Sequence, residues 1–474
     1  MKILFIASEC APIAKIGGLA DVVGSLPKAL KKLGVDVSVI IPYYQSLNVP
    51  EKNMLAGKDF SVIFDGKEEH FELWQTYLPP CKTHPDECVP LYLIKNDGIF
   101  GKSIYLEKDA SPSGNEKEAT RFLFLSAAGI KVAEALGVSI LHCHDWHAAI
   151  IPFLKKNKPG SRAKSILTIH NLEYQGVYDK NLVNRLLGTD FAGDVNCLET
   201  GILNADFITT VSPNYAKETL TKEFGAGLEE SLKKRGNSFK GILNGIDVEK
   251  FDPKNDPALQ KNYFIENLGD KAENKASLQR RCFKKTDSQI PVLGIVSRLA
   301  DQKGFDLIIE IFDSLIKKNL QIVLLGQGAG NYEKFFGKMA EKFPQKVFAR
   351  IGFDSKLAQQ IYGGADMFLM PSRFEPCGLG QMIAMRYGTV PIARSVGGIK
   401  DTVQNIRVQN EKVQGTGFLF EKYDSKELLS ATERALGAFQ DKKIWKQIQI
   451  NDMTQDFSWE KSAKIYVSLY KRLQ

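Results

Sequence analysis

Short apolar runs rich in valine and isoleucine alternate with helix-like stretches along this chain, and the alternation occurs twice. The first series lies at residues 2–8, 36–42, 138–144, 164–170, 206–212 and 239–245, and the second at residues 291–297, 321–326, 346–352, 365–372 and 389–395. Such runs are typical of strands buried in a parallel sheet. The sequence therefore predicts an α/β chain with two Rossmann-like, doubly wound domains that face a deep cleft.

The domain boundaries are predicted from the stretch in which the alternation of strands and helices is interrupted. A polar, lysine-rich stretch from Val248 to Pro291 separates the two series. We expect an N-terminal domain over residues 1–247 and a C-terminal domain over residues 248–455. A last helix-like stretch, residues 456–474, has no strand after it, and we expect it to pack back on the first domain.

Length and charge narrow the class of protein. The 474 residues exceed what one hydrophobic core usually organises. The net charge of +8 is spread without a basic block, which argues against dedicated nucleic-acid binding and suits an acidic small substrate. The chain starts without the pattern of a signal peptide, and no apolar run reaches about 18 residues, so we expect a cytoplasmic protein without a membrane segment.

The seven cysteines lack the spacing of a metal site. Cys81 and Cys88 are near enough in sequence to pair. Free thiols are nevertheless the expected state, because disulfides are rare in cytoplasmic proteins.

The first polar cluster follows the first predicted strand. Lys15 is followed by Gly17 and Gly18 at the start of a predicted helix. Glycines let a ligand approach the backbone closely, and the first amides of a helix attract an anion. An ordinary tight turn with an exposed lysine is the alternative.

Histidines gather behind two later strands of the first half. The stretch His142–Ala148 holds three histidines and Asp145, and His170 with Asn171 follows the next strand. Two of the three histidines end a strand and the third begins a helix, so a metal site is disfavoured. Asp145 is the better candidate for binding sugar hydroxyls, whereas a structural histidine is the alternative for His170.

Two polar clusters follow strands of the second half. Arg298 and Lys303 lie five residues apart on a loop that enters a helix, a pairing that suits a diphosphate; a solvated surface pair is the alternative. Glu375 precedes a proline, which holds its backbone extended. Residues 377–379 are predicted to begin a helix whose free backbone amides form an anion-binding site.

Seven motifs in this order resemble those of the bacterial glycogen synthases and plant-type starch synthases over nearly the whole chain. They are KIGGLADVVG, HDWH, TIHN, GILNGID, SRLADQKG, SRFEPCGL and FSWEKSA. The resemblance implies a retaining, metal-independent glucosyltransferase of the GT-B type without a cofactor. It also implies ADP-glucose as the donor and the nonreducing end of an α-1,4-glucan, as in glycogen or starch, as the acceptor.

The resemblance also implies roles for individual residues. The catalytic set would be Asp145, His170, Arg298, Lys303 and Glu375. The donor-binding set would be Lys15, Gly17, Gly18, Asn244, Cys377, Gly378, Leu379 and Gly380, with Asp247 near the hinge.

Three positions depart from the pattern of this family. Gly380 stands where threonine is usual, Val396 replaces the threonine of the last glycine loop, and Phe251 replaces a tryptophan. A hydroxyl at position 380 would reach a donor phosphate, so Gly380→Thr is expected to strengthen donor binding. Room for a neighbour such as Ile399 is the alternative reason for the glycine.

The mechanism that the resemblance implies is front-face attack. The chain contains no D-x-D triplet, the metal-binding motif of the other large glycosyltransferase fold. Cationic side chains would then stabilise the departing diphosphate. A UDP-glucose-dependent enzyme, an enzyme with a small acceptor of the sucrose or trehalose type, and an inactive glucan-binding protein remain as alternatives.

Overall fold

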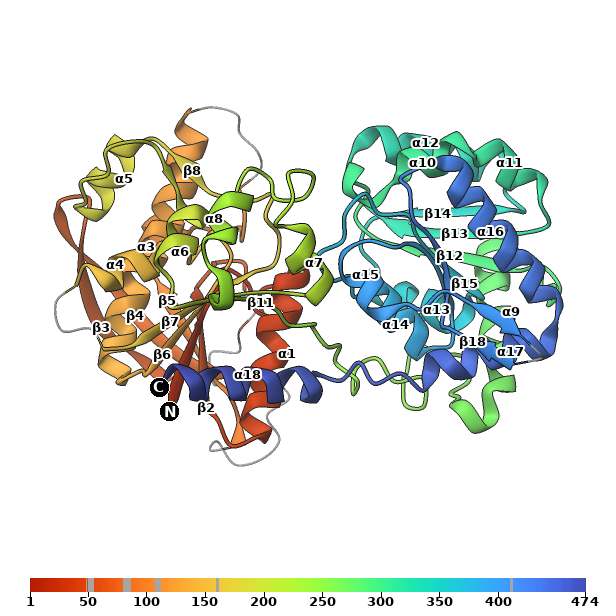
Figure 1. The fold of residues 1–474 in the computed structure, drawn as a ribbon, viewed down its shortest axis with the longest axis horizontal. Coiled ribbons are helices and arrows are strands. Elements are labelled where there is room, and N and C mark those ends of the chain that lie inside the picture. Colours follow the sequence, from red (N-terminus) through yellow and green to blue (C-terminus); the bar gives the residue numbers. More distant parts are fainter. Residues whose placement is uncertain (48, 50–54, 80–86, 107–111, 159–161, 410–411) are drawn as a thin grey trace. The chain divides into compact units, whose positions relative to one another are not determined.

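The computed structural model describes residues 1–47, 49, 55–79, 87–106, 112–158, 162–409 and 412–474 (Figure 1). The chain divides into two compact units. Unit 1 contains residues 1–245 and 459–474, and unit 2 contains residues 246–458. None of the described helices is both long and apolar enough to cross a membrane.

Unit 1 is built on a nine-stranded sheet with the order β11-β10-β7-β6-β1-β2-β5-β4-β3. Seven strands run parallel, whereas β4 and β3 are antiparallel additions at one edge. The predicted pattern missed β3, β4 and β5. The strands are β1 (Lys2–Ile6), β2 (Asp36–Pro42), β3 (Leu55–Phe64), β4 (Lys67–Tyr77), β5 (Pro90–Lys95), β6 (Ile140–His144), β7 (Lys164–Ile169), β10 (Phe207–Thr210) and β11 (Phe239–Gly241).

The helices of unit 1 include one from the far end of the chain. Helix α18 packs on α1, and the two helices cross in Figure 1. A short hairpin pairs β8 (Val177–Tyr178) with β9 (Val195–Asn196). The helices are α1 (Gly18–Lys32), α2 (Asp97–Phe100), α3 (Pro112–Leu136), α4 (Ile151–Lys156), α5 (Lys180–Leu187), α6 (Cys197–Asn204), α7 (Pro213–Glu218), α8 (Glu229–Lys233) and α18 (Trp459–Leu473).

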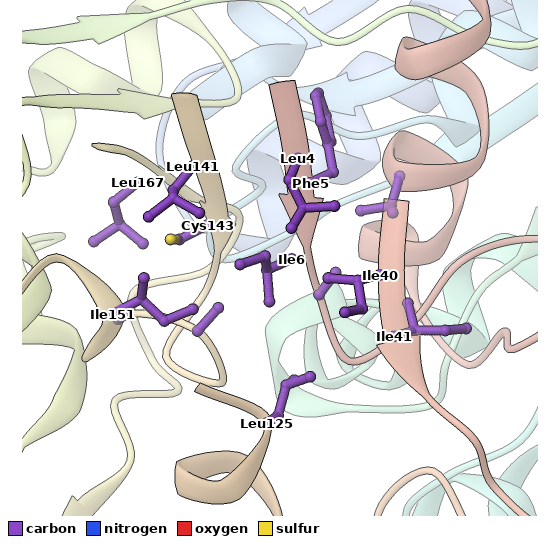
Figure 2. Packing of buried hydrophobic residues seen from close by; sticks show 14 of the residues in the cluster. Leu4, Phe5, Ile6, Ile40, Ile41, Leu125, Leu141, Cys143, Ile151 and Leu167 are labelled. Atoms are coloured by element: carbon purple, nitrogen blue, oxygen red, sulfur yellow. The ribbon is translucent and has the colours of Figure 1, made fainter. Parts of the chain in front are cut away.

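The core of unit 1 is centred on β1 and its neighbours. Leu4, Phe5 and Ile6 are fully buried, and Figure 2 shows them between the side chains of β2 and β6. Tyr466 and Tyr470 of α18 belong to the same buried cluster. The final helix is therefore part of the core of this unit.

Unit 2 is built on a fully parallel, six-stranded sheet with the order β14-β13-β12-β15-β16-β19. The strand order reverses between β12 and β15, which is where ligands bind in doubly wound folds. The strands are β12 (Val292–Val296), β13 (Gln321–Gly326), β14 (Val347–Ile351), β15 (Met367–Met370), β16 (Val390–Arg394) and β19 (Phe418–Phe420), and β17 (Arg407–Gln409) pairs with β18 (Lys412–Gln414).

Nine helices surround this sheet in the described part of unit 2. They are α9 (Lys271–Phe283), α10 (Phe305–Glu310), α11 (Phe312–Lys317), α12 (Gly330–Lys342), α13 (Ser355–Gly364), α14 (Gly380–Arg386), α15 (Gly397–Thr402), α16 (Ser425–Gln440) and α17 (Lys442–Met453).

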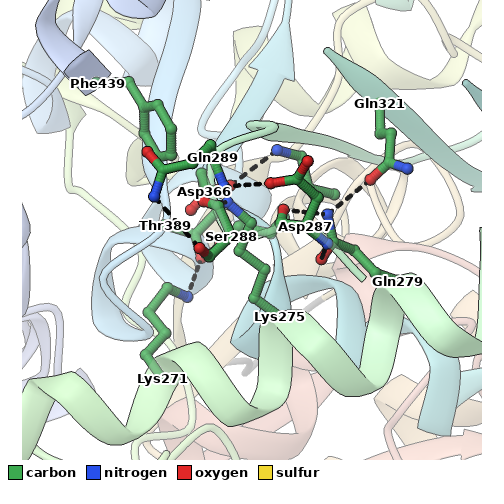
Figure 3. A network of polar contacts seen from close by, with 12 residues as sticks. Lys271, Lys275, Gln279, Asp287, Ser288, Gln289, Gln321, Asp366, Thr389 and Phe439 are labelled. Carbon is green, nitrogen blue, oxygen red and sulfur yellow. Dashed lines mark hydrogen bonds and ion pairs between the residues drawn. The ribbon is translucent and has the colours of Figure 1, made fainter. Parts of the chain in front are cut away.

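Buried charges hold the amino ends of β15 and β16 to helix α9 (Figure 3). Lys275 Nζ pairs with Asp366 Oδ2 at 2.8 Å, and Lys271 Nζ donates to Thr389 Oγ1 at 2.7 Å. Burial lowers the pKa of Lys271 to about 7. Because ligands of parallel sheets bind at the carboxyl ends of the strands, this network supports the fold and lies away from the candidate site.

The expectation of free thiols holds for part of the chain. Cys10, Cys143, Cys197, Cys282 and Cys377 are free. Cys88 is disulfide-bonded, contrary to the expectation, and Cys81 lies outside the described residues.

Candidate active site

The loop between β1 and α1 carries the first predicted residues. Lys15 is exposed, and its Nζ pairs with Asp21 Oδ1 of α1 at 2.5 Å. A Cβ added to Gly18 would meet no atom within 4 Å. The position of Gly18 at the start of α1 therefore leaves room for a ligand.

Glu9 is a buried carboxylate that the sequence analysis missed. Its Oε2 accepts hydrogen bonds from the amides of Ile16 (2.6 Å) and Gly17 (2.8 Å). Its Oε1 accepts one from the Tyr105 hydroxyl at 2.5 Å. The Gly17 amide, which we expected to face an anionic ligand, is thus occupied by a carboxylate of the protein itself.

Asp145 connects the loops that follow β6 and β7. Its backbone has a φ of +53°, a left-handed conformation that is uncommon for residues other than glycine. Its Oδ1 accepts from the His170 amide at 2.6 Å, and the Asn171 amide also donates to this carboxylate. Burial raises the pKa of Asp145 to about 7, although these two amide bonds act in the opposite direction. Asp145 thereby fixes the backbone of His170.

The histidines around Asp145 form a buried stack. The His142 and His144 rings are stacked, with their centres 4.5 Å apart. His142 bonds the Tyr470 hydroxyl at 2.8 Å and Thr168 Oγ1 at 2.6 Å, while His144 Nδ1 lies 3.0 Å from His170 Nε2. Within the described ranges, no group of three or more histidine, cysteine, aspartate or glutamate side chains is arranged to hold a metal ion.

Asn244 lies at the end of unit 1. Its side chain is buried, and the Oδ1 atom has no hydrogen-bond partner among the described residues. Asp247, at the start of unit 2, accepts from the amides of Glu249 and Lys250. Asn244 Oδ1 is therefore a buried acceptor without a partner among the described residues, whereas Asp247 caps a turn.

Lys303 and Glu375 meet in unit 2 because β12 and β15, which precede them, are neighbours in the sheet. Lys303 Nζ lies 2.6 Å from Glu375 Oε2, and Ser372 Oγ donates to the same oxygen at 3.0 Å. Glu375 is buried, whereas Arg298 is exposed and contacts Gln302 Oε1 at 3.3 Å. The sequence predicted separate partners for Lys303 and Glu375, but here the two are bound to each other.

Glycines let the loops of this site approach one another. Gly304 has a φ of +72°, and a Cβ there would lie 2.0 Å from the Pro371 oxygen. Gly397 has a φ of +48°, and its Cβ would lie 1.9 Å from the Glu375 oxygen. A side chain at Gly304 would push the loop of Lys303 away from Pro371, and a side chain at Gly397 would push the loop after β16 away from Glu375.

The helix after Glu375 begins later than predicted. Gly378 has a φ of +74°, which is incompatible with a helix, and α14 begins at Gly380. Residues 377–379 therefore form an irregular turn, in which Gln381 Nε2 donates to the oxygens of Cys377 (3.0 Å) and Gly378 (2.8 Å). The prediction that a helix begins at residues 377–379 and binds an anion through its first amides is therefore wrong about where the helix begins.

Gly380 is explained by packing. A Cβ at this position would lie 3.0 Å from Phe368 Cε1 and 3.4 Å from Met370 Sδ. Phe368 is buried against Tyr362, at a ring distance of 5.1 Å, and has little room to move. The steric alternative is therefore favoured, with Phe368 in place of the expected Ile399.

Phe353 is a second residue that the sequence analysis missed. It follows β14 at the carboxyl edge of the unit 2 sheet and is 81% exposed, the most exposed large apolar side chain among the described residues. A flat aromatic face at this edge offers a surface on which a planar base can stack. An aromatic residue just after a predicted strand is the signal that would have identified it.

Two family models match the chain. The starch synthase catalytic domain matches residues 2–234, and glycosyl transferases group 1 matches residues 280–447. A glycogen synthase of Kosmotoga olearia is 42% identical over 482 residues, covering all of this chain and 98% of that protein. A glycogen synthase of Thermotoga maritima is 42% identical over 498 residues and is covered to 99%.

Two solved structures are also similar to this chain. The catalytic domain of starch synthase IV from Arabidopsis thaliana, bound to ADP and acarbose, is similar with a TM-score of 0.89 and 32% identity, covering all of this chain and 99% of that chain. Sucrose-phosphate synthase from Thermosynechococcus elongatus has a TM-score of 0.62 at 18% identity, which shows a common fold alone.

Proposed function

This chain belongs to the glycogen synthase family, and we propose that it transfers glucose from ADP-glucose to the nonreducing end of an α-1,4-glucan with retention of configuration. The predicted fold class is confirmed by the two largely parallel sheets and by the match to starch synthase IV. The observation that carries the proposal is the Lys303–Glu375 pair, with Arg298 on the same loop as Lys303, at the point where the strand order of unit 2 reverses.

The donor diphosphate is the proposed ligand of Arg298 and Lys303. Negative charge grows on the diphosphate as the glycosidic bond breaks, and positioned cations stabilise it in that state. Lys303 is partly exposed, so its ammonium group can contact a phosphate oxygen while Glu375 holds it from the buried side. The turn 377–379 and Gly380, the first residue of α14, would contribute backbone amides to the donor, and Phe353 a surface for its base.

Glu375 is proposed to face the transferred glucose. The sugar becomes oxocarbenium-like and positive in the transition state, and a fixed carboxylate stabilises that charge. Retaining glycosidases use two carboxyl groups that attack and protonate. The mechanism proposed here is front-face attack, in which the acceptor hydroxyl enters on the side from which the diphosphate leaves.

Residues of unit 1 are proposed to bind the glucose and the diphosphate as well. His170, fixed by Asp145, would contact the sugar hydroxyls, and Lys15 and Gly18 the donor. The unpartnered Asn244 Oδ1 would accept a hydrogen bond from the donor. Glu9 shapes the loop of Lys15 and is not assigned a contact with substrate.

The choice of ADP-glucose is supported by the similar starch synthase IV, whose structure holds ADP and acarbose. The test is incorporation of labelled glucose into glycogen from ADP-glucose and from UDP-glucose, each with EDTA. We expect incorporation from ADP-glucose that EDTA does not reduce. Incorporation only from UDP-glucose, only into a small acceptor, or only after Mg²⁺ or Mn²⁺ is restored would contradict the proposal.

Arg298→Ala tests the role of the cations in the same assay. We expect kcat to fall by about 10²-fold, the usual effect of losing one positioned donor to transition-state charge. Arg407→Ala, in the exposed strand β17, is the matched control and should leave kcat unchanged. A rise in KM without a loss of kcat would mean that Arg298 binds only the ground state.

A further inference from the structure

We propose that His144 is a positioning residue that donates its Nδ1 proton to His170 Nε2 and thereby fixes His170 in one tautomer, with its proton on Nδ1. The inference rests on the proposed contact between His170 and the donor glucose. It goes beyond that contact, because it states which ring nitrogen of His170 faces the ligand and that this nitrogen is a hydrogen-bond donor.

One ring nitrogen of His170 is already occupied. Its Nε2 lies 3.0 Å from His144 Nδ1, and among the residues that the structure describes His144 is the only hydrogen-bond partner of this ring. His170 is only partly buried, whereas His144 is fully buried. Nδ1 is therefore the nitrogen of His170 that remains for a ligand.

Both rings are neutral at physiological pH. Burial lowers the pKa of His170 to about 3 and the pKa of His144 well below its usual value. Each neutral ring carries one proton, and the contact between two ring nitrogens requires that one of them donates and the other accepts. Only two arrangements of the protons satisfy this requirement.

The surroundings of His144 distinguish the two arrangements. Its Nε2 is buried and has no hydrogen-bond partner among the described residues. If His170 were the donor, His144 would carry its own proton on this Nε2, as an N–H group buried without an acceptor. The opposite arrangement leaves only the lone pair of His144 Nε2 without a partner. Buried acceptors that lack a partner are more common in proteins than buried N–H groups that lack one. We therefore assign His144 as the donor.

The ring of His144 is held by stacking. It lies 5.0 Å from the Phe5 ring and 4.5 Å from the His142 ring. His142 is itself fixed by Tyr470 of α18 and by Thr168 of β7. His144 therefore has little freedom to rotate and to exchange the nitrogen that it presents to His170.

The consequence is a fixed donor at His170 Nδ1. An N–H group in this position suits an acceptor such as the oxygen of a sugar hydroxyl or a phosphate. Free histidine exchanges between two tautomers, and a fixed tautomer removes the need to select one when the ligand binds.

The direct test is a ¹H–¹⁵N NMR spectrum of the full-length protein with ¹⁵N-labelled histidine and no substrate. Six histidines make the signals few enough to assign from single substitutions. We expect the neutral His170 ring to carry its proton on Nδ1 and to have a bare Nε2. A proton on His170 Nε2 would overturn the proposal. Because no turnover is needed, this result is independent of whether the chain transfers glucose.

His144→Phe keeps a ring in the stack and removes the hydrogen bond. We expect His170 to become a mixture of tautomers, and kcat to fall about tenfold, the scale of one lost hydrogen bond, with the KM for glycogen unchanged. His147→Phe is the matched control, because His147 is also buried but is not bonded to His170. A folded His144→Phe protein with the wild-type His170 tautomer, or an equal change in His147→Phe, would overturn the proposal.

Discussion

Lys303 and Glu375 are individually recognisable in the sequence, but their pairing is visible only in the structure. We expect the pair to affect stability as well as the proposed transfer, because removing one partner would leave the other buried without a counter-charge. We expect Glu375→Gln to lower the free energy of unfolding by roughly 1.5–3 kcal/mol, the cost of losing a hydrogen bond to a charged group. Urea denaturation of the two proteins measures this difference.

Lys303→Met supplies the control for this prediction. In a double-mutant cycle, the second substitution should cost less once the first partner has been removed. Additive effects of the two substitutions would show that the two groups do not interact in solution.

Asp145 predicts a pH dependence of stability. Its pKa rises from 3.8 to about 7 on folding, so between these values the folded state binds more protons than the unfolded state. The contribution of Asp145 to the free energy of unfolding is therefore greatest below pH 3.8 and is lost as the pH rises through 7. Asp145→Asn lacks this titration, and its stability relative to wild type should rise with pH across the same interval.

The measurement is a set of urea denaturation curves for both proteins between pH 4 and pH 8. We expect the difference to change by more than about 1 kcal/mol, the equivalent of one pKa unit. A difference that is independent of pH would mean that the carboxyl group titrates alike in the folded and unfolded states.

Among the elements, α14 gives a prediction about packing. Gly380→Ala places a Cβ 3.0 Å from the buried Phe368 ring, and overpacking of this kind typically costs about 1–3 kcal/mol. Gly337→Ala in α12 is the matched control, since a Cβ there meets no atom within 4 Å. It should stabilise the protein by roughly 0.5–1 kcal/mol through helix propensity. Equal shifts of the two melting temperatures would contradict the steric explanation of Gly380.

Helix α18 gives a second prediction, because its last turn reaches the histidine stack. Tyr470→Phe keeps the ring in the core and removes the hydroxyl that bonds His142 at 2.8 Å. The unpaired, buried histidine nitrogen should cost about 1–3 kcal/mol. Tyr174→Phe, at an exposed side chain, should leave the unfolding midpoint unchanged. A Tyr470→Phe protein as stable as wild type would show that this bond adds nothing to stability.

The alternation of strands and helices was predictable because parallel strands are buried on both faces and appear as continuous apolar runs. The antiparallel strand β4 was missed because most of its residues are exposed or only partly buried, and short β19 because three residues give no periodicity. The polar clusters at the strand ends of both units could be named from the sequence. The role of Glu9 could not, because it depends on a loop that folds back onto the carboxylate. The late start of α14 depends likewise on the backbone of Gly378.

For the whole chain, the proposed reaction is α-1,4-glucan synthesis from ADP-glucose with retained configuration. The most direct measurement is a ¹H NMR time course of the purified protein with ADP-glucose and maltoheptaose, in the presence of EDTA. We predict that the anomeric signal of ADP-glucose falls while the signal of internal α-1,4 linkages grows by an equal amount. Release of free glucose, a β-linked product, or no growth of the α-1,4 signal would contradict the account.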